Sequence, residues 1–259
     1  MNQSQIAFQR LTSHQLTQAG FKNGVQVSSK LQVGSITLVE AEFSREPDEY
    51  EFYVIEVGHT LAHLLSGCEQ MMQAVLFLST FSPTKKMKAH GITRSSHLQY
   101  NIENYLIRTQ SIYDRILKLV NAIFHLGIDP RNCRHDTISR NLHVRVTDVP
   151  AKLKNLNKLL GKYRQDRNVI IHHESYQEDE LRKIEMYHLL LSKQDEDELP
   201  DYELLQVVTK DLTREFVKRK IEEFEQFNEA VFLEMASLFD SLESRYQKLQ
   251  NSLFEKCGY

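Results

Sequence analysis

Arg167, Asn168 and His172 lie within the six-residue stretch RNVIIH. Arginine stays charged at any physiological pH and presents a fork of donors that suits phosphate oxygens. Histidine donates or accepts a proton near neutral pH without needing a large pKa shift. These residue types together predict a site that binds a phosphodiester and moves protons beside it.

The spacing of the three residues constrains how such a site is assembled. Asn168 and His172 are four residues apart and share one face of a helix, so the amide can reach the imidazole or a substrate. Arg167 and His172 are five residues apart, and a regular helix separates them by about 140°. They converge if the helix kinks or ends between them, or if two copies of the chain meet. We therefore expect a local irregularity or a composite site.

A metal-free ribonuclease can be built from these groups. The ribose 2′-OH is an internal nucleophile that attacks the adjacent phosphorus, and DNA lacks it. A histidine transfers a proton and an arginine stabilises the charge that develops on the phosphorane. The expected products are a 2′,3′-cyclic phosphate and a 5′-OH.

The approach to this stretch is basic. Residues 84–170 carry 17 Lys or Arg against 6 Asp or Glu, whereas the net charge of the whole chain is −3. Such a local excess predicts an anion-binding surface, although a solvated helix face paired with the acidic segments fits it equally. Within this region, the residues that we expect to contact substrate are Lys158, Lys162, Arg164 and His173, with Lys154, Lys158 and Lys162 forming a row at helical spacing.

The rest of the chain predicts an all-α bundle of long helices. Only 9 Gly and 5 Pro occur in 259 residues, which disfavours a turn-rich β fold. Apolar residues at spacings of three and four predict the long helices. The expected ranges are 47–81, 97–126, 149–163 leading into RNVIIH, 178–193, and 202–255 as one long helix or two stacked ones.

The N-terminal part departs from this pattern. Apolar residues between Val25 and Phe43 recur mostly at spacing two, with Gly34 and Ser35 between two runs. This alternation predicts a small β-hairpin. We therefore divide the chain into an N-terminal extension, residues 1–46, and a helical bundle, residues 47–259.

The motif resembles the signature of HEPN domains (higher eukaryotes and prokaryotes nucleotide-binding): Arg, then Asn, Asp or His, then a few residues and a His. HEPN domains are helical bundles, and many are ribonucleases in toxin–antitoxin, abortive-infection and CRISPR systems. The resemblance implies that Arg167 and His172 are catalytic and that Asn168 assists them. It also implies a homodimer with two motifs in one cleft, RNA as substrate, and a regulatory or antitoxin partner.

Some features depart from the family or leave alternatives open. Certain HEPN toxins carry a Tyr two positions after the motif His as an AMPylation site, and Glu174 occupies that position here. The motif is short, so a helix-end arginine in a salt bridge beside an incidental histidine is a second interpretation. A non-catalytic HEPN-like module that binds nucleotide, RNA or a protein is the corresponding alternative function.

Cofactors, metals and membranes play no part in the expected function. His59, His63 and Cys68 have ligand-like spacing, but a structural zinc site needs a second Cys or His pair. The three cysteines, Cys68, Cys133 and Cys257, are widely spaced and odd in number, as in a reducing cytosol. We find no signal peptide and no apolar run long enough to span a bilayer, so we expect a cytoplasmic protein.

Overall fold

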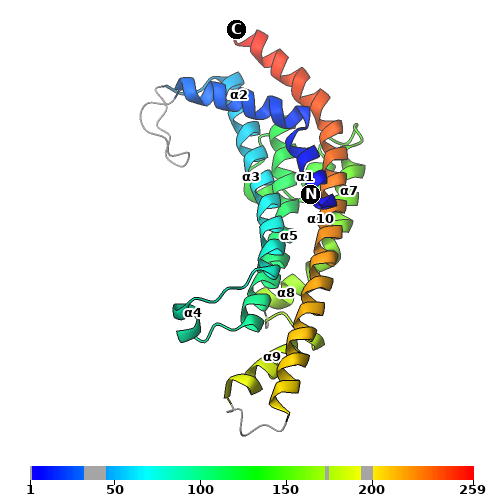
Figure 1. Cartoon of the computed structure of the whole chain (residues 1–259). Helices are drawn as coiled ribbons and strands as arrows, with labels where there is room; N and C mark the ends of the chain where they lie inside the picture. The colour runs from blue at the N-terminus through cyan, green and yellow to red at the C-terminus, as the bar shows by residue number, and fades with distance from the viewer. Residues whose placement is uncertain (1, 32–44, 173–174, 194–200) are drawn as a thin grey trace. The chain divides into compact units, whose positions relative to one another are not determined.

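The computed structural model describes residues 2–31, 45–172, 175–193 and 201–259 (Figure 1). Every regular element within these ranges is a helix. The longest are α3 (Glu49–Ser79), α5 (Arg94–Phe124) and α10 (Tyr202–Lys256). The shorter α-helices are α1 (Gln3–Thr12), α2 (Gln15–Leu31), α4 (Lys85–Ala89), α6 (His135–Ser139), α7 (Val149–Leu160), α8 (Arg164–His172) and α9 (Asp179–Lys193). Two 3-10 turns, η1 (Pro130–Asn132) and η2 (Gly161–Tyr163), join the set.

Local sequence explains where the long helices begin and end. A capping box opens α3, because Asp48 Oδ1 accepts from the Glu51 amide at 2.9 Å and Glu51 accepts from the Asp48 amide at 3.0 Å. Gly127, with a φ of 66°, follows the end of α5 in a conformation that favours glycine. No Gly or Pro interrupts α10, and its 55 residues form one continuous helix.

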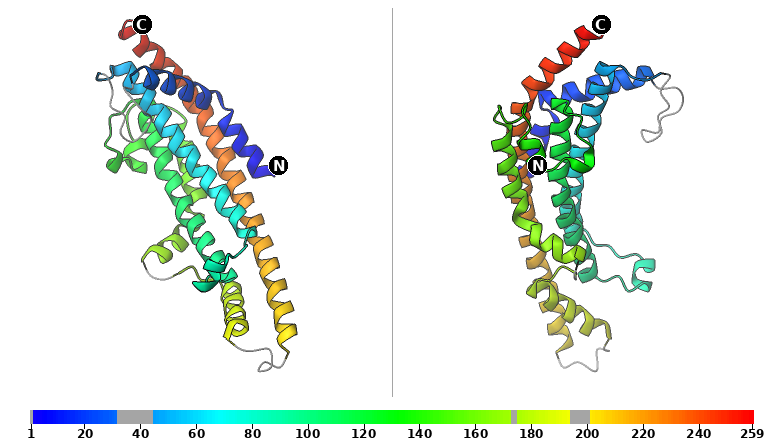
Figure 2. Two further views of the ribbon diagram at one scale, coloured as in Figure 1. Left: turned by 60° about the vertical axis from the view of Figure 1, so that its left-hand side comes forward. Right: turned by 180° about the vertical axis from the view of Figure 1, so that it is seen from behind.

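The chain folds into two compact units, and the long helices contribute to both. Unit 1 consists of Met1–Cys68, Ser111–Gly161 and Glu229–Tyr259. Unit 2 consists of Glu69–Gln110 and Lys162–Asn228. Figure 2 gives two further views of the helices. The RNVIIH stretch and the whole of α8 belong to unit 2, so this unit holds the candidate site.

Unit 1 packs the N-terminal helices α1 and α2 against the first part of α3 and the last part of α10. Phe8 on α1 contacts Phe232, with ring centroids 5.6 Å apart, and Asn23 on α2 donates to the Tyr246 hydroxyl at 3.1 Å. A Cβ on Gly24 would lie 3.3 Å from the Cα of Gly58, so the two helix backbones meet where neither has a side chain. The N-terminal residues are therefore an integral part of this unit.

Unit 2 is centred on aromatic side chains from three segments. Tyr105 on α5 stacks on Phe224 of α10, with centroids 3.8 Å apart, and its hydroxyl donates to Asn228 Oδ1 at 2.8 Å. Tyr163, at the end of η2, packs edge-on against Phe224 and Phe227. Since η2 leads directly into α8, this aromatic cluster anchors the start of the motif helix.

The predicted N-terminal hairpin is wrong in its first half. Val25, Val27 and Leu31 belong to α2, and no strand occurs among the described residues. The buried positions of α2 include Leu16, Gly20, Gly24, Val27 and Leu31, which follow a helical spacing of three or four. Exposed Val25, two residues before the buried Val27, gave the appearance of spacing two. Residues 32–44, where the second half was expected, lie outside the described residues.

No helix in the described part of the chain combines the length and the apolar character that a bilayer span requires.

Candidate functional site

Helix α8, Arg164–His172, carries the whole RNVIIH stretch near the surface of unit 2. Asn168 and His172 are exposed, and Arg167 is half-buried. The helix is continuous from its first to its last residue, and it ends at His172. The irregularity that precedes it, η2, lies four residues before Arg167 rather than between Arg167 and His172. Within one copy, the two side chains therefore leave the helix about 140° apart.

The Arg167 side chain is held by its neighbour. Its Nη1 donates to the Asn168 amide oxygen at 3.0 Å. Its Nε is buried and has no hydrogen-bond partner among the described residues. A guanidinium with an unused donor retains the capacity to bind an anionic oxygen. Asn168 thus contacts Arg167, the residue next to it, whereas its spacing had pointed to His172.

The predicted substrate-contacting residues do not form one group. Lys158 is exposed on α7 in unit 1, whereas Lys162, Arg164 and the motif belong to unit 2. The 3-10 turn breaks the expected row of lysines after Lys158. The Lys162 ammonium lies 3.2 Å from Glu223 and over the Tyr163 ring. Arg164 is exposed at the first turn of α8, and His173 lies outside the described residues.

An ion network surrounds both ends of the motif helix, and sequence reasoning missed it. We use "ion network" for Tyr163, Tyr176, Glu178, Lys220 and Glu223. Before α8, the Tyr163 hydroxyl donates to Glu223 at 2.7 Å. After α8, the Tyr176 hydroxyl donates to Glu178 at 2.8 Å. Lys220, with 8% of its side chain exposed, joins the two halves by contacting Glu178 at 2.8 Å and Glu223 at 3.0 Å.

The network shifts the pKa values of its members in the direction that charged pairs require. Burial of Glu223 acts to raise its pKa, but hydrogen bonds from Tyr163, Lys220 and Lys162 outweigh burial and lower the pKa to about 2. Burial of Lys220 acts to lower its pKa, but Glu178 and Glu223 outweigh it and raise the pKa. Both groups are therefore charged at neutral pH, and each stabilises the other.

Two acidic residues near the motif have different roles. Burial raises the pKa of Asp166, the residue before Arg167. Glu103 on α5 accepts from the Tyr176 backbone amide at 2.8 Å. Glu103 thereby fixes the chain just beyond α8. Tyr176, the tyrosine nearest to the motif His, has its hydroxyl occupied by Glu178 and Lys220.

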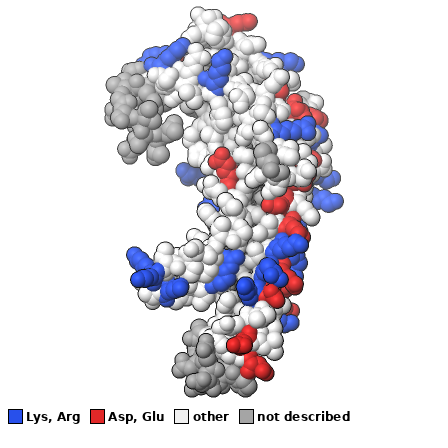
Figure 3. Space-filling model, in the orientation of Figure 1, with Lys and Arg blue, Asp and Glu red and all other residues white. Residues whose placement is uncertain are grey.

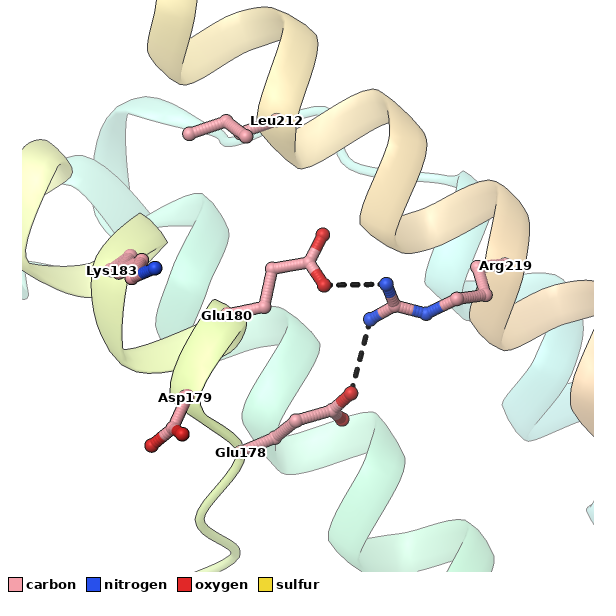
Figure 4. A pocket seen from close by; sticks show the side chains of 6 residues that line it. All are labelled: Glu178, Asp179, Glu180, Lys183, Leu212 and Arg219. Atoms are coloured by element: carbon pink, nitrogen blue, oxygen red, sulfur yellow. Dashed lines mark hydrogen bonds and ion pairs between the residues drawn. The ribbon is translucent and has the colours of Figure 1, made fainter.

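The open hollow between α9 and α10 is occupied by ion pairs between its own side chains, so we do not assign it as a substrate site (Figure 4). Its lining includes Glu178, Asp179, Glu180 and Arg219. The Arg219 guanidinium lies between two carboxylates, 3.0 Å from Glu178 and 2.5 Å from Glu180. An anionic ligand would have to displace both. Among the described residues, no three His, Cys, Asp or Glu side chains group in a way that could hold a metal ion.

The comparison with known protein families supports the class that the fold and the RNVIIH motif indicate. The all-α bundle is that of a HEPN protein, the class that the RNVIIH stretch resembles. A family model described as HEPN_Cthe2314-like HEPN matches residues 53–243, so the chain belongs to this family. A search of curated proteins and a search of solved structures found no significant match. The match begins inside α3 and ends inside α10, and therefore spans α8.

Proposed function

We propose that the protein is a metal-independent HEPN endoribonuclease that acts as a homodimer. The observation that carries the proposal is the continuity of α8, which leaves Arg167 and His172 on divergent faces of one copy. A second copy related by a two-fold axis can supply the missing group, because such an interface brings the same surface of both subunits together. The half-buried Arg167 has no carboxylate partner among the described residues, so its charge is suited to the phosphate.

In this mechanism the 2′-OH attacks the phosphorus and the bond to the 5′ oxygen breaks. His172 transfers the proton, Arg167 stabilises the negative phosphorane, and Asn168 holds the arginine. Arg164, exposed on the first turn of α8, is proposed to contact a neighbouring phosphate. Lys158, Lys162 and His173 stay in the proposal as further substrate contacts, with Lys162 having to exchange its Glu223 pairing for RNA.

The direct test compares the wild type with Arg167→Ala and His172→Ala on RNA in EDTA. We expect the wild type to produce 2′,3′-cyclic phosphates, each variant to lose at least about 100-fold in rate, and DNA of the same sequence to stay intact. Arg182→Ala and His143→Ala are matched controls, because both residues are exposed and neither belongs to α8. No cleavage by the wild type, or cleavage that survives both motif variants, contradicts the proposal. RNA binding without cleavage supports the non-catalytic module instead.

A mixing experiment tests the composite site. If each site takes its arginine from one copy and its histidine from the other, a dimer of one Arg167→Ala and one His172→Ala chain retains one intact site. Random mixing then restores about a quarter of wild-type activity, since half of the dimers are mixed. Unmixed variants stay inactive. No recovery, although mixed dimers are detected by native mass spectrometry, excludes a composite site of this kind.

The proposal carries a cellular expectation. A ribonuclease of this type in the cytoplasm acts as a toxin or a defence effector and needs a partner that restrains it. Expression of the wild type should arrest growth, and His172→Ala should not. Growth that is equally unaffected by both, at equal protein levels, argues against a toxin role and leaves the ribonuclease assay as an independent test.

A further inference from the structure

The helix α4 and its flanks form the most one-sided charge distribution in unit 2. We call residues 80–97 the lysine arm. The chain has no Asp or Glu from Gln70 to Ile102, yet it carries Lys85, Lys86 and Lys88 on α4. Figure 3 shows the basic side chains gathered over α4, without acidic side chains among them on that face. A cationic surface that lacks local anions is the electrostatic footprint expected of a polyanion site.

The arm lysines differ from the other cations of unit 2. Lys85, Lys86 and Lys88 are exposed, and no described carboxylate lies within 4.0 Å of any of them. By contrast, several cations from the segment 162–228 pair with carboxylates of the same unit, as the contacts of Arg182 with Asp179 and of Arg214 with Asp211 illustrate. The positive charge of the arm is therefore not used to hold the unit together.

Arg94 extends the same field at the base of the arm. Its Nη2 donates to the Leu78 carbonyl oxygen at 2.5 Å, and its guanidinium lies 5.5 Å from the centre of the Phe81 ring. Burial, and the charge of Arg94, lower the pKa values of His97 and His188. The imidazoles of His97 and His188 thus favour the neutral form, first because burial penalises the imidazolium and second because the Arg94 charge repels it.

The backbone of the arm forms a hydrogen-bonded turn, which sets the positions from which its lysines extend. The Thr84 hydroxyl accepts from the Met87 amide at 3.2 Å and caps the start of α4. After α4, the Ile92 amide donates to the Met87 carbonyl oxygen at 3.0 Å, and Gly91 adopts a φ of 70°. A preformed site loses less conformational entropy on binding than a disordered lysine tract does.

We propose that the lysine arm binds backbone phosphates of RNA outside the cleavage motif. The choice of RNA as the polyanion rests on the proposed function, since unit 2 also carries the motif helix. The chemistry of the contact is general: lysine ammonium groups bind phosphate oxygens as point charges and read no base. The arm therefore sets the affinity and position of the strand, while Arg167 and His172 act on the scissile phosphate.

The test uses the full chain carrying His172→Ala, so that binding is measured without cleavage. In this background we compare Lys85→Gln/Lys86→Gln/Lys88→Gln with Lys183→Gln/Lys210→Gln/Lys218→Gln, a control that removes the same charge from other exposed lysines of unit 2. Fluorescence anisotropy of a short labelled single-stranded RNA is recorded across a range of salt concentrations. We expect the arm variant to bind about 10- to 100-fold more weakly at about 0.1 M salt and its log–log salt slope to fall by about 2. The control should change both quantities far less.

Several outcomes overturn the proposal. An arm variant that binds like its control, a salt slope that is unchanged, or a His172→Ala chain that does not bind RNA would each do so. Arm-dependent binding to phosphatidylserine vesicles without RNA binding assigns the arm to a membrane surface instead. The result can be distinguished from that of the cleavage assay. A wild type that binds RNA through the lysine arm but does not cleave it refutes only the proposed ribonuclease activity. A wild type that cleaves RNA without depending on the arm refutes only the proposed role of the arm. Single-stranded DNA should show the same arm dependence, because phosphates carry the contact.

Discussion

The ion network and the lysine arm belong to the same unit but treat positive charge in opposite ways. Lys220 is buried and contacts two carboxylates within 3.0 Å. Lys85, Lys86 and Lys88 are exposed, with no described carboxylate within 4.0 Å. A buried cation is tolerated only when anions and hydrogen bonds compensate its lost hydration. The difference separates charge that maintains the fold from charge available to a partner.

The charge of Arg167 is also available to a partner, although in the sequence Arg167 lies between Tyr163 and Tyr176 of the ion network. Its guanidinium donates to the amide oxygen of Asn168, and no described carboxylate pairs with it. The ion network thus neutralises the charge around α8 while leaving the arginine of the motif without an acidic partner. Variants that exchange or remove charge in the two regions test whether the ion network stabilises the fold and whether the lysine arm does not.

The largest effect on stability is expected for Lys220→Ala. It leaves Glu178 and Glu223 near each other without the cation that they share, and removal of one member of a buried ion pair costs about 3 kcal/mol. Urea unfolding, read by hydrogen exchange of the α8 and α10 amides, measures the loss. Lys218→Ala is the control, because Lys218 is exposed and lies 4.0 Å from Glu222; its cost should stay within about 0.5 kcal/mol. Equal losses of stability in the two variants would show that the ion network contributes no more to the fold than an exposed ion pair does.

Glu223→Gln should have a smaller effect in the same direction. The amide can still accept from Tyr163, and Lys220 keeps Glu178, so we expect a loss of about 1–2 kcal/mol in the free energy of unfolding. The neighbouring Glu222→Gln alters an exposed carboxylate and should cost less than about 0.5 kcal/mol. A ranking in which Glu222→Gln is the more damaging variant contradicts the assigned role of Glu223.

Acid should destabilise unit 2 through Glu223. The folded-state pKa of about 2 lies below the ordinary value of 4.5, so its contribution is present above about pH 5 and is lost as pH falls towards 2. Asp166 acts in the opposite sense, because burial raises its pKa and its protonation favours the folded state. The wild type should lose more stability than Glu223→Gln between pH 5 and pH 2. Parallel pH profiles for the two proteins would show that Glu223 does not govern this range.

The arm should show the smallest stability effect and a large effect on binding. Lys85→Gln/Lys86→Gln/Lys88→Gln removes three exposed charges that have no ion-pair partner among the described residues, so the free energy of unfolding should change by less than about 0.5 kcal/mol. Circular dichroism during urea unfolding measures this quantity. A loss comparable to that of Lys220→Ala would mean that the arm is structural, and the contrast between the two regions would fail.

Much of the fold could be predicted from apolar spacing and caps. The expected helices 97–126 and 178–193 correspond to α5 and α9, with boundaries that differ by a few residues. The first half of the hairpin failed because Val27 and Leu31, four residues apart, are buried in α2, whereas Val25 is exposed, so the apparent spacing of two did not mark one face of a strand. Nearby, Gly20 and Gly24 in α2 pack closely against Gly58 in α3, a tertiary contact that single-sequence patterns do not reveal. A glycine at a helix crossing and a glycine in a turn look the same in the sequence.

The candidate site was predictable only in part. The RNVIIH spacing indicated the residue types and the divergence of Arg167 from His172, and α8 retains that divergence. The irregularity expected between them occurs instead at η2, where Gly161 provides the local signal. The partnership of Tyr163 with Glu223 joins residues sixty positions apart, and no local pattern encodes it. Asn168, four residues from His172, contacts Arg167 because its amide oxygen lies within reach of the adjacent guanidinium.

The sixty-residue separation of Tyr163 and Glu223 also has a consequence for biosynthesis. A ribosome that adds about 5–20 residues per second makes Tyr163, just before α8, about 3–12 s before it reaches Glu223. During that interval the motif helix has neither Glu223 nor the aromatic surface of α10 to pack against. Helices shorter than about 12 residues are marginal alone in water, and α8 has nine. The motif helix therefore acquires its full set of contacts only after the Glu223 segment of α10 has been synthesised.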